Sequence, residues 1–310
     1  DPIRVVSYAI VEGQEVVDDG VFYVGAPFHC GYKATFFETE SSLFSGLTEF
    51  ILKVDPDIIV GYNTEKESIG YLSERALTFG TKDWFNSISR LKIPIASFDL
   101  CKKIGGRIIF NTWRFLRRKE KFRTYDLSNA ANEILGAPFP EITNSALTSF
   151  ANLAPHRFIH YFHSKVMTVV AILFKKTIIE EIVELALVVG LDFGSTLSRG
   201  SQFYIESLLS RVSWRMGYLL NSPTSKDVAN QRAPMSLPLV MEPESGYYKD
   251  PVMVIDFTSL YPSCLIAYNL DYSTVIGRSA DASRGGRLGY LNYFHVKSKT
   301  LEDLLHRKKI

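Results

Sequence analysis

The chain has 310 residues, of which 46% are hydrophobic and 22% are charged, and its formal net charge is +2. This length predicts two domains and part of a third, and the composition is that of a soluble globular protein. The near-neutral charge is no general sign of nucleic-acid binding, so any basic surface must be local.

Cysteine usage and hydropathy exclude several further classes. Cys30, Cys101 and Cys264 lie far apart and form no CxxC pair, so they support neither a disulfide framework nor a zinc site, which fits a reducing compartment. The first twenty residues carry no signal-peptide pattern. The most apolar long run, 166–191, is interrupted by lysines and glutamates, so it predicts an amphipathic buried helix and no membrane span. Asp1 is not an initiator methionine and the sequence stops within a helical pattern, so we expect a segment of a larger protein.

In chain order, the first half of the sequence predicts a mixed α/β layer. Two alternating strands are predicted over 3–13 and 14–26, with a turn at Gly13 or at 18–20. A helix over 41–53, an apolar strand over 57–63 and a helix over 67–80 that Gly80 closes come next. A segment then begins as a strand at 107 and becomes strongly basic by 123, and a helix capped by Gly136 follows over 125–136.

The second half predicts long helices over 157–190, a linker over 221–238, and a hairpin-like approach over 242–257. The approach ends in the apolar residues 252–255, which run directly into Asp256. We expect 252–255 to form a buried strand with this carboxylate at its carboxyl end, and a helix to start near Pro262 and Ser263.

A carboxylate at the edge of a sheet can hold a hard divalent cation, and Mg²⁺ prefers one or two carboxylates together with phosphate oxygens. The turn after Asp256 presents several backbone N–H groups ahead of a helix, an arrangement that binds phosphate. A metal-binding acid beside a phosphate-binding turn is half of a nucleotidyl-transfer site. For a lone aspartate a simple helix N-cap would be the better interpretation, but the eight-residue string DFTSLYPS, 256–263, is far more specific.

This string resembles motif A of the family B DNA polymerases, Asp-x-x-Ser-Leu-Tyr-Pro-Ser. The resemblance implies that Asp256 ligates two catalytic Mg²⁺ ions, with the backbone carbonyl of Phe257 on one of them and a second acid supplied by a part of the chain outside this sequence. It also implies that amides from Ser259 to Tyr261 bind the triphosphate of a dNTP, that the Tyr261 ring excludes a ribose 2′-hydroxyl, and that Leu260 packs behind it.

The likeness extends over much of the chain. Segments 55–63, 197–207, 241–248 and 296–309 resemble, in that order, the strand before exonuclease motif II, the connection to the palm, the template-binding Gly-Tyr element (here Gly246 and Tyr247), and the entry to the fingers. The resemblance implies an RNase-H-like, exonuclease-type mixed-sheet domain over 1–190, a connecting region over 191–240, and a partial palm with the start of the fingers over 241–310. Within the family, the strings SRGSQ, MEPES, IAYN, NTWRFLR and GYNTEKESIGYL are similar to those of the translesion (zeta-like) branch.

The acids that proofreading members use are absent from two matching positions. Ser68 stands where the second exonuclease motif has its aspartate, and Lys165 stands where the third has its acid, although Tyr161 is retained. A hydroxyl cannot replace a carboxylate ligand and a lysine repels metal ions, so we expect a scaffold without exonuclease chemistry. We expect Glu65 and Glu67 nearby to be solvated or to cap a helix.

The polymerase half lacks anything like motif B or the Asp-Thr-Asp turn of motif C, so we expect these 310 residues alone to be inactive. As part of a longer chain, the resemblance implies a nuclear DNA-directed DNA polymerase in translesion synthesis, replication and repair, with primer–template DNA, dNTP and accessory subunits as partners and no membrane. Two alternatives remain: a replicative member with a decayed editing domain, and a degenerate paralogue that only binds DNA or a partner.

Three further features carry weaker hypotheses. The basic run 114–123 is interleaved with aromatic residues, and we expect a solvated face or a subunit contact more than a phosphate contact. The histidines at 156, 160 and 163 have metal-like spacing, but no acid or cysteine accompanies them in sequence, so we expect surface histidines. We expect Trp113 and Trp214 to be core anchors.

Overall fold

The computed structural model describes residues 2–79, 84–92, 104–218, 224–229 and 239–270, and a short strand pair at 287–288 and 291–292. The chain divides into two compact units, 1–211 and 212–310. Four sequence predictions fall outside the described residues: the helix end at Gly80, the environment of Cys101, most of the linker 221–238, and the fingers-like segment 296–309.

The first unit contains a three-stranded sheet. Strand β1 (Val5–Glu12) pairs antiparallel with β2 (Glu15–Val24), and β3 (Ala34–Phe37) pairs parallel with β2. The turn lies at Gly13, whose φ of +62° is readily adopted by glycine. Of the two turn positions that the sequence offered, Gly13 is therefore confirmed, whereas residues 18–20 lie within β2.

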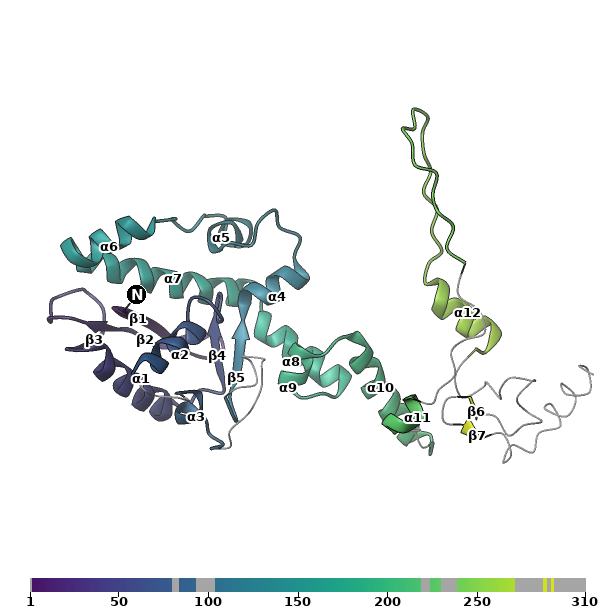
Figure 1. Cartoon of the computed structure of the whole chain (residues 1–310), viewed down its shortest axis with the longest axis horizontal. Coiled ribbons are helices and arrows are strands. Elements are labelled where there is room, and N and C mark those ends of the chain that lie inside the picture. Colours follow the sequence, from purple (N-terminus) through teal and green to yellow (C-terminus); the bar gives the residue numbers. More distant parts are fainter. Residues whose placement is uncertain are drawn as a thin grey trace, which may run out of the picture. The chain divides into compact units, whose positions relative to one another are not determined.

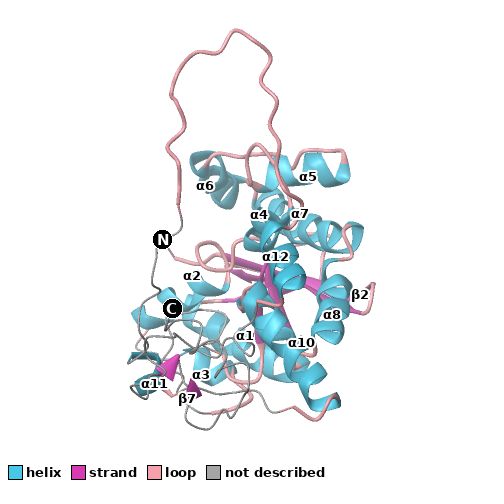
Figure 2. Ribbon diagram, turned by 90° about the vertical axis from the view of Figure 1, so that its right-hand side faces the viewer, coloured by secondary structure: helices cyan, strands magenta, loops and turns pink. Residues whose placement is uncertain are grey.

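Helices cover both faces of this sheet because the side chains of a strand alternate between its faces. Phe22 packs with residues of α1 (Glu40–Val54), α2 (Ile69–Thr78) and α3 (Trp84–Ile88) in one apolar cluster. Its neighbours Val21 and Tyr23 pack on the other face against α6 (Asn144–Leu153) and α7 (Pro155–Lys175). The long helix α7 runs across the sheet (Figure 1, Figure 2). A mixed α/β architecture is thus confirmed.

A second, parallel strand pair positions the candidate site. Strand β4 (Ile58–Gly61) lies alongside β5 (Ile108–Asn111), and Ile109 and Phe110 of β5 face different clusters. The Phe110 cluster includes helices α4 (Thr112–Lys119), α5 (Leu127–Leu135), α7 and α8 (Ile178–Val189). Gly136 caps α5 with a φ of +80°, as predicted.

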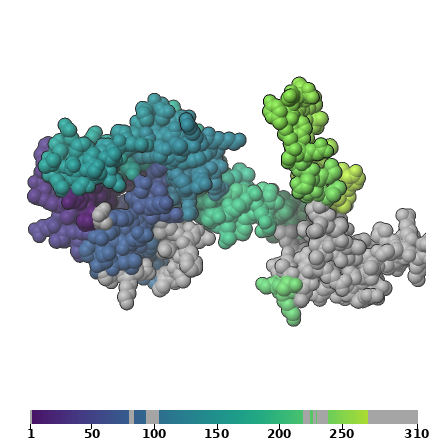
Figure 3. Space-filling view, turned by 45° about the horizontal axis from the view of Figure 1, so that its top comes forward, coloured from purple at the N-terminus to yellow at the C-terminus, as the bar shows by residue number. Residues whose placement is uncertain are grey.

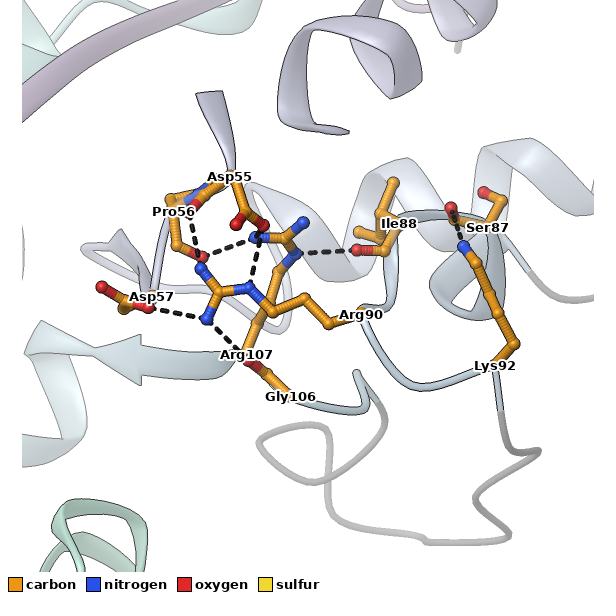
Figure 4. Close-up of polar contacts among 9 residues, drawn as sticks. All are labelled: Asp55, Pro56, Asp57, Ser87, Ile88, Arg90, Lys92, Gly106 and Arg107. Atoms are coloured by element: carbon orange, nitrogen blue, oxygen red, sulfur yellow. Dashed lines mark hydrogen bonds and ion pairs between the residues drawn. The ribbon is translucent and has the colours of Figure 1, made fainter. Parts of the chain in front are cut away.

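Two arginines, Arg90 and Arg107, hold the amino ends of these two strands together (Figure 4). The Arg107 side chain is 1% exposed, and it donates to the carbonyls of Ile88 and Pro56 over 2.8 and 2.7 Å and pairs with Asp55 over 2.8 Å. Arg90 pairs with Asp55 over 2.8 Å and also donates to the Asp55 carbonyl over 2.6 Å. Hydrogen bonds from Arg90 and, after it, from Arg107 hold the pKa of the Asp55 carboxyl below its usual value, against the opposing effect of its burial.

The remaining helices are α9 (Phe193–Ser198), α10 (Ser201–Arg215), α11 (Ser225–Ala229) and α12 (Leu260–Tyr268), followed by β6 (Arg287–Leu288) and β7 (Leu291–Asn292). Within the residues that the structure describes, no helix combines the length and the hydrophobicity that a membrane crossing requires. Figure 3 shows one face of the described residues in a space-filling view.

Three expectations for the second half are wrong. Residues 252–255 form no strand and are between 68% and 89% exposed, because no strand among the described residues pairs with them. The hairpin expected over 242–257 is likewise not formed. Trp214 is 82% exposed and is therefore no core anchor, whereas Trp113 does pack against the Phe110 cluster.

We predict that Arg107→Met lowers the free energy of unfolding by about 2–4 kcal/mol, because two buried carbonyls lose their donor. Urea unfolding of the chain, followed by circular dichroism, measures this loss. The matched control is Lys92→Met, which removes an exposed lysine that donates to the carbonyls of Asn86 and Ser87. An equal loss in both variants would contradict the role of Arg107.

Candidate functional site

The first candidate site lies in the turn between β4 and α2. Burial raises the pKa of the Tyr62 hydroxyl, which donates to the carbonyls of Tyr125 and Asp126 over 2.9 and 3.1 Å. The Gly70 amide donates to the Thr64 carbonyl over 2.8 Å. These bonds hold the turn against α5 on one side and the start of α2 on the other.

Ser68 occupies the N-cap position of α2 but makes no capping hydrogen bond with its side chain. Its hydroxyl oxygen is buried and has no hydrogen-bond partner among the described residues. A side chain at Gly61 would come within 2.8 Å of this oxygen, so β4 and the turn are packed closely here. An unpartnered buried hydroxyl costs free energy.

Lys165 of α7 lies beside the turn that carries Ser68. Its ammonium pairs with the Glu67 carboxylate over 2.6 Å, and Glu67 adjoins Ser68 in sequence. Glu65 pairs with Arg114 of α4 over 2.6 Å. The Glu65 and Glu67 side chains are 37% and 52% exposed, in line with the expectation that they are solvated, and each also forms an ion pair that was not expected.

This arrangement does not fit a two-metal site. The turn offers Glu65 and Glu67 as acids, and each is neutralised by a cation, while the Lys165 ammonium would repel a metal ion. No group of three or more histidines, cysteines or acids in the described part of the chain could hold a metal ion.

A neighbouring polar contact was missed by the sequence analysis. His163 of α7 is 8% exposed and bonds the Asp19 carboxylate over 2.6 Å, and the ring of Tyr32 packs against it at 4.3 Å. His160 bonds the Tyr32 hydroxyl. The expectation of surface histidines is therefore wrong for His163, which is buried. The sequence does not reveal this pairing, because the acid partner comes from β2, far away in sequence.

The second candidate site is the segment around Asp256. Asp256 is exposed, with no hydrogen bond or ion pair to any described residue. Helix α12 begins at Leu260, close to the predicted start, and the Ser263 amide donates to the Ser259 carbonyl over 2.9 Å. Ser259 has a φ of +52°, a left-handed conformation that costs a residue other than glycine about 1 kcal/mol.

The other residues of this site lie open as well. Phe257, Leu260 and Tyr261 are 75%, 44% and 78% exposed, and Tyr247 of the Gly246–Tyr247 pair is 88% exposed. A single unpaired carboxylate with a backbone carbonyl beside it fits the ligand preference of Mg²⁺, which takes one or two carboxylates and completes its shell with water or phosphate oxygens.

Comparison with known proteins relates both regions to one family. Residues 7–130 match the model of the DNA polymerase family B exonuclease domain, and residues 191–305 match that of DNA polymerase family B. The DNA polymerase zeta catalytic subunit of Arabidopsis thaliana is 35% identical to this chain in sequence, over 81% of the chain's length. That of Saccharomyces cerevisiae is 37% identical over 78% of the chain's length. The DNA polymerase delta catalytic subunit of Plasmodium falciparum is 28% identical over 91% of the chain. The chain spans only 15% and 17% of the two zeta relatives and 28% of the delta relative.

We predict that the Lys165–Glu67 pair contributes only about 0.5–1 kcal/mol, because both side chains are partly exposed. A double-mutant cycle with Lys165→Met and Glu67→Gln, measured by urea unfolding at low salt, isolates this coupling. The Lys33–Asp18 pair, with the more exposed lysine, is the matched control and should couple less. A coupling above about 2 kcal/mol would show that the pair behaves as a buried one.

Proposed function

Because the chain belongs to the family B DNA polymerases, we propose that it is the segment of a zeta-like, translesion polymerase that runs from an exonuclease-type domain to the first part of the palm. The full-length protein would transfer nucleotides from dNTPs to a primer 3′-hydroxyl on a DNA template. The observation that carries this proposal is the string DFTSLYPS at the start of α12, within the region that matches the polymerase model.

In this proposal the Asp256 carboxylate and the Phe257 carbonyl would hold Mg²⁺, and a second acid would come from another part of the full-length chain. The bound ions would supply charge stabilisation for phosphoryl transfer. Backbone amides of Ser259, Leu260 and Tyr261, at the amino end of α12, bind the triphosphate, because helix N-termini present unpaired N–H groups. The Tyr261 ring lies against the sugar and excludes a 2′-hydroxyl, and Gly246 with Tyr247 contacts the template.

The exposure of these residues supports an assembled site in the longer chain. Residues 252–255 are apolar and unpaired here, and a strand becomes stable when neighbouring strands satisfy its backbone groups. We infer that palm strands elsewhere in the full-length protein pair with them and bring the second acid to Asp256.

We further propose that the first unit is an RNase-H-like domain that has lost proofreading. The support is local: Ser68 replaces a carboxylate ligand, and the Lys165 ammonium occupies the Glu67 carboxylate. Absence of editing suits synthesis past lesions and extension of mismatched ends. The same proposal covers nuclear location and association with accessory subunits.

We predict that Asp256→Ala in the full-length protein lowers primer extension at least about 1,000-fold, because a metal ligand supplies several kcal/mol of transition-state stabilisation. Asp250→Ala removes an exposed acid six residues earlier and should leave the rate within about twofold. Extension by Asp256→Ala at the parent rate would remove Asp256 from its role. No extension by the parent would favour the degenerate, DNA-binding alternative.

We predict that the full-length protein, given Mg²⁺ and no dNTP, leaves a primer with an unpaired 3′ end at its original length, because the Ser68–Lys165 region cannot hold two metal ions. Gel analysis of a labelled primer measures this. Asp256→Ala serves as the control, because it should block reversal of polymerisation at the polymerase site but leave any excision by the first unit intact. Shortening by both proteins would contradict the loss of proofreading.

A further inference from the structure

A basic strip lies on the first unit, away from Asp256 in sequence. It is defined by Arg117, Arg118, Lys121, Arg123, Lys175 and Arg199. The first two belong to α4, the next two to the segment that follows it, Lys175 ends α7, and Arg199 caps the carboxyl end of α9.

Helix geometry turns the α4 cations outward. Leu116 is 1% exposed and anchors the helix in the core. At 100° per residue, Arg114 and Arg118 lie about 160° from Leu116 around the helix and Arg117 lies about 100° from it, and all three side chains are exposed. Helix α4 therefore presents a continuous basic face to solvent.

Side-chain contacts connect the segments that carry the outlying members of the strip to α4 and Glu120. The Arg118 guanidinium donates to the Leu197 carbonyl over 3.0 Å, two residues before Arg199. The ammonium of Lys176, adjacent to Lys175, pairs with Glu120 over 2.7 Å. Lys119 of α4 also pairs with Glu181 of α8, which lies beside α4 (Figure 1).

Three acids beside α4 are already engaged. Glu65, Glu120 and Glu181 pair with Arg114, Lys176 and Lys119. None of the six strip cations pairs with an acid among the described residues. An uncompensated cluster of this kind gains free energy from a polyanion, chiefly through release of condensed counterions.

Aromatic rings lie under two of the cations. Arg117 stacks over Trp113 at 5.2 Å, and Arg199 stacks over Phe203 at 5.0 Å, where Phe203 is 37% exposed. Guanidinium planes and exposed rings are surfaces on which unpaired bases stack. This combination favours a single strand over a duplex, whose bases are already stacked.

We propose that the basic strip binds single-stranded nucleic acid through its phosphates, with bases stacking on the Arg117 and Arg199 planes. The choice of partner rests on the proposed polymerase function, for which an unpaired template strand is a substrate. The strip belongs to the first unit, whereas Asp256 belongs to the second, and the strip contributes affinity without sequence preference. Binding requires neither Mg²⁺ nor a nucleotide.

The test measures binding of a fluorescent oligothymidylate to the full-length protein by anisotropy, without dNTP or metal, from 50 to 300 mM salt. The variant is Arg117→Gln/Lys121→Gln/Arg123→Gln. Loss of three phosphate contacts should weaken binding about 100-fold near 0.1 M salt and reduce the magnitude of the salt slope by about 2. The matched control, Lys53→Gln/Lys66→Gln/Arg157→Gln, removes three other exposed cations of the same unit and should change affinity less than about threefold.

The outcomes separate the alternatives. An unchanged salt slope in the strip variant, or an equal loss in the control, overturns the proposal and leaves the Asp256 experiments unaffected. If the strip variant binds oligothymidylate as tightly as the parent does, the proposal is also overturned. The strip would then be a binding surface for an acidic protein partner. Thermal unfolding of each variant confirms that the fold is retained, and a duplex competitor that displaces the strand at equal concentration would contradict the preference for single strands.

Discussion

The burial of Arg107 is the constraint on which the first unit depends. A guanidinium that is 1% exposed must satisfy its donors internally, and here it does so with the Ile88 and Pro56 carbonyls and the Asp55 carboxylate. These partners belong to α3 and to the connection between α1 and β4. One side chain therefore fixes the start of β4 against the start of β5. The position of β4 in turn determines where the turn that follows it lies.

Alternation along the strands then builds the rest of the unit. Because neighbouring residues such as Ile109 and Phe110 face opposite sides, β5 contributes to two apolar clusters at once. Helix α7 crosses the sheet and carries Lys165 to Glu67 and His163 to Asp19. The turn after β4 is thus held by ion pairs and close packing where the resemblance to proofreading enzymes would place carboxylates and metal ions.

The second unit presents the opposite case. The apolar residues 252–255 and the Tyr261 ring are exposed, and Asp256 has no partner among the described residues. Backbone groups of an extended segment need a neighbouring strand before they form a sheet. The local preference for a turn and a helix is strong enough to form α12 alone, whereas the strand before it is not formed. An exposed apolar segment of this kind forms a strand only through contacts with other parts of a chain.

The sequence by itself determined what depends on near neighbours. The period of the apolar residues predicted the helices α1, α7 and α8, Gly13 and Gly136 marked a turn and a cap, and the string from Asp256 to Ser263 identified the family. Only the tertiary structure decided which charges meet. Glu67 with Lys165, Asp19 with His163 and the bonds of Arg107 join residues that are between 19 and 144 positions apart, and solvated and paired charges look alike in a sequence. Burial likewise separated Trp113 from Trp214, because the neighbours that cover a side chain come from other elements.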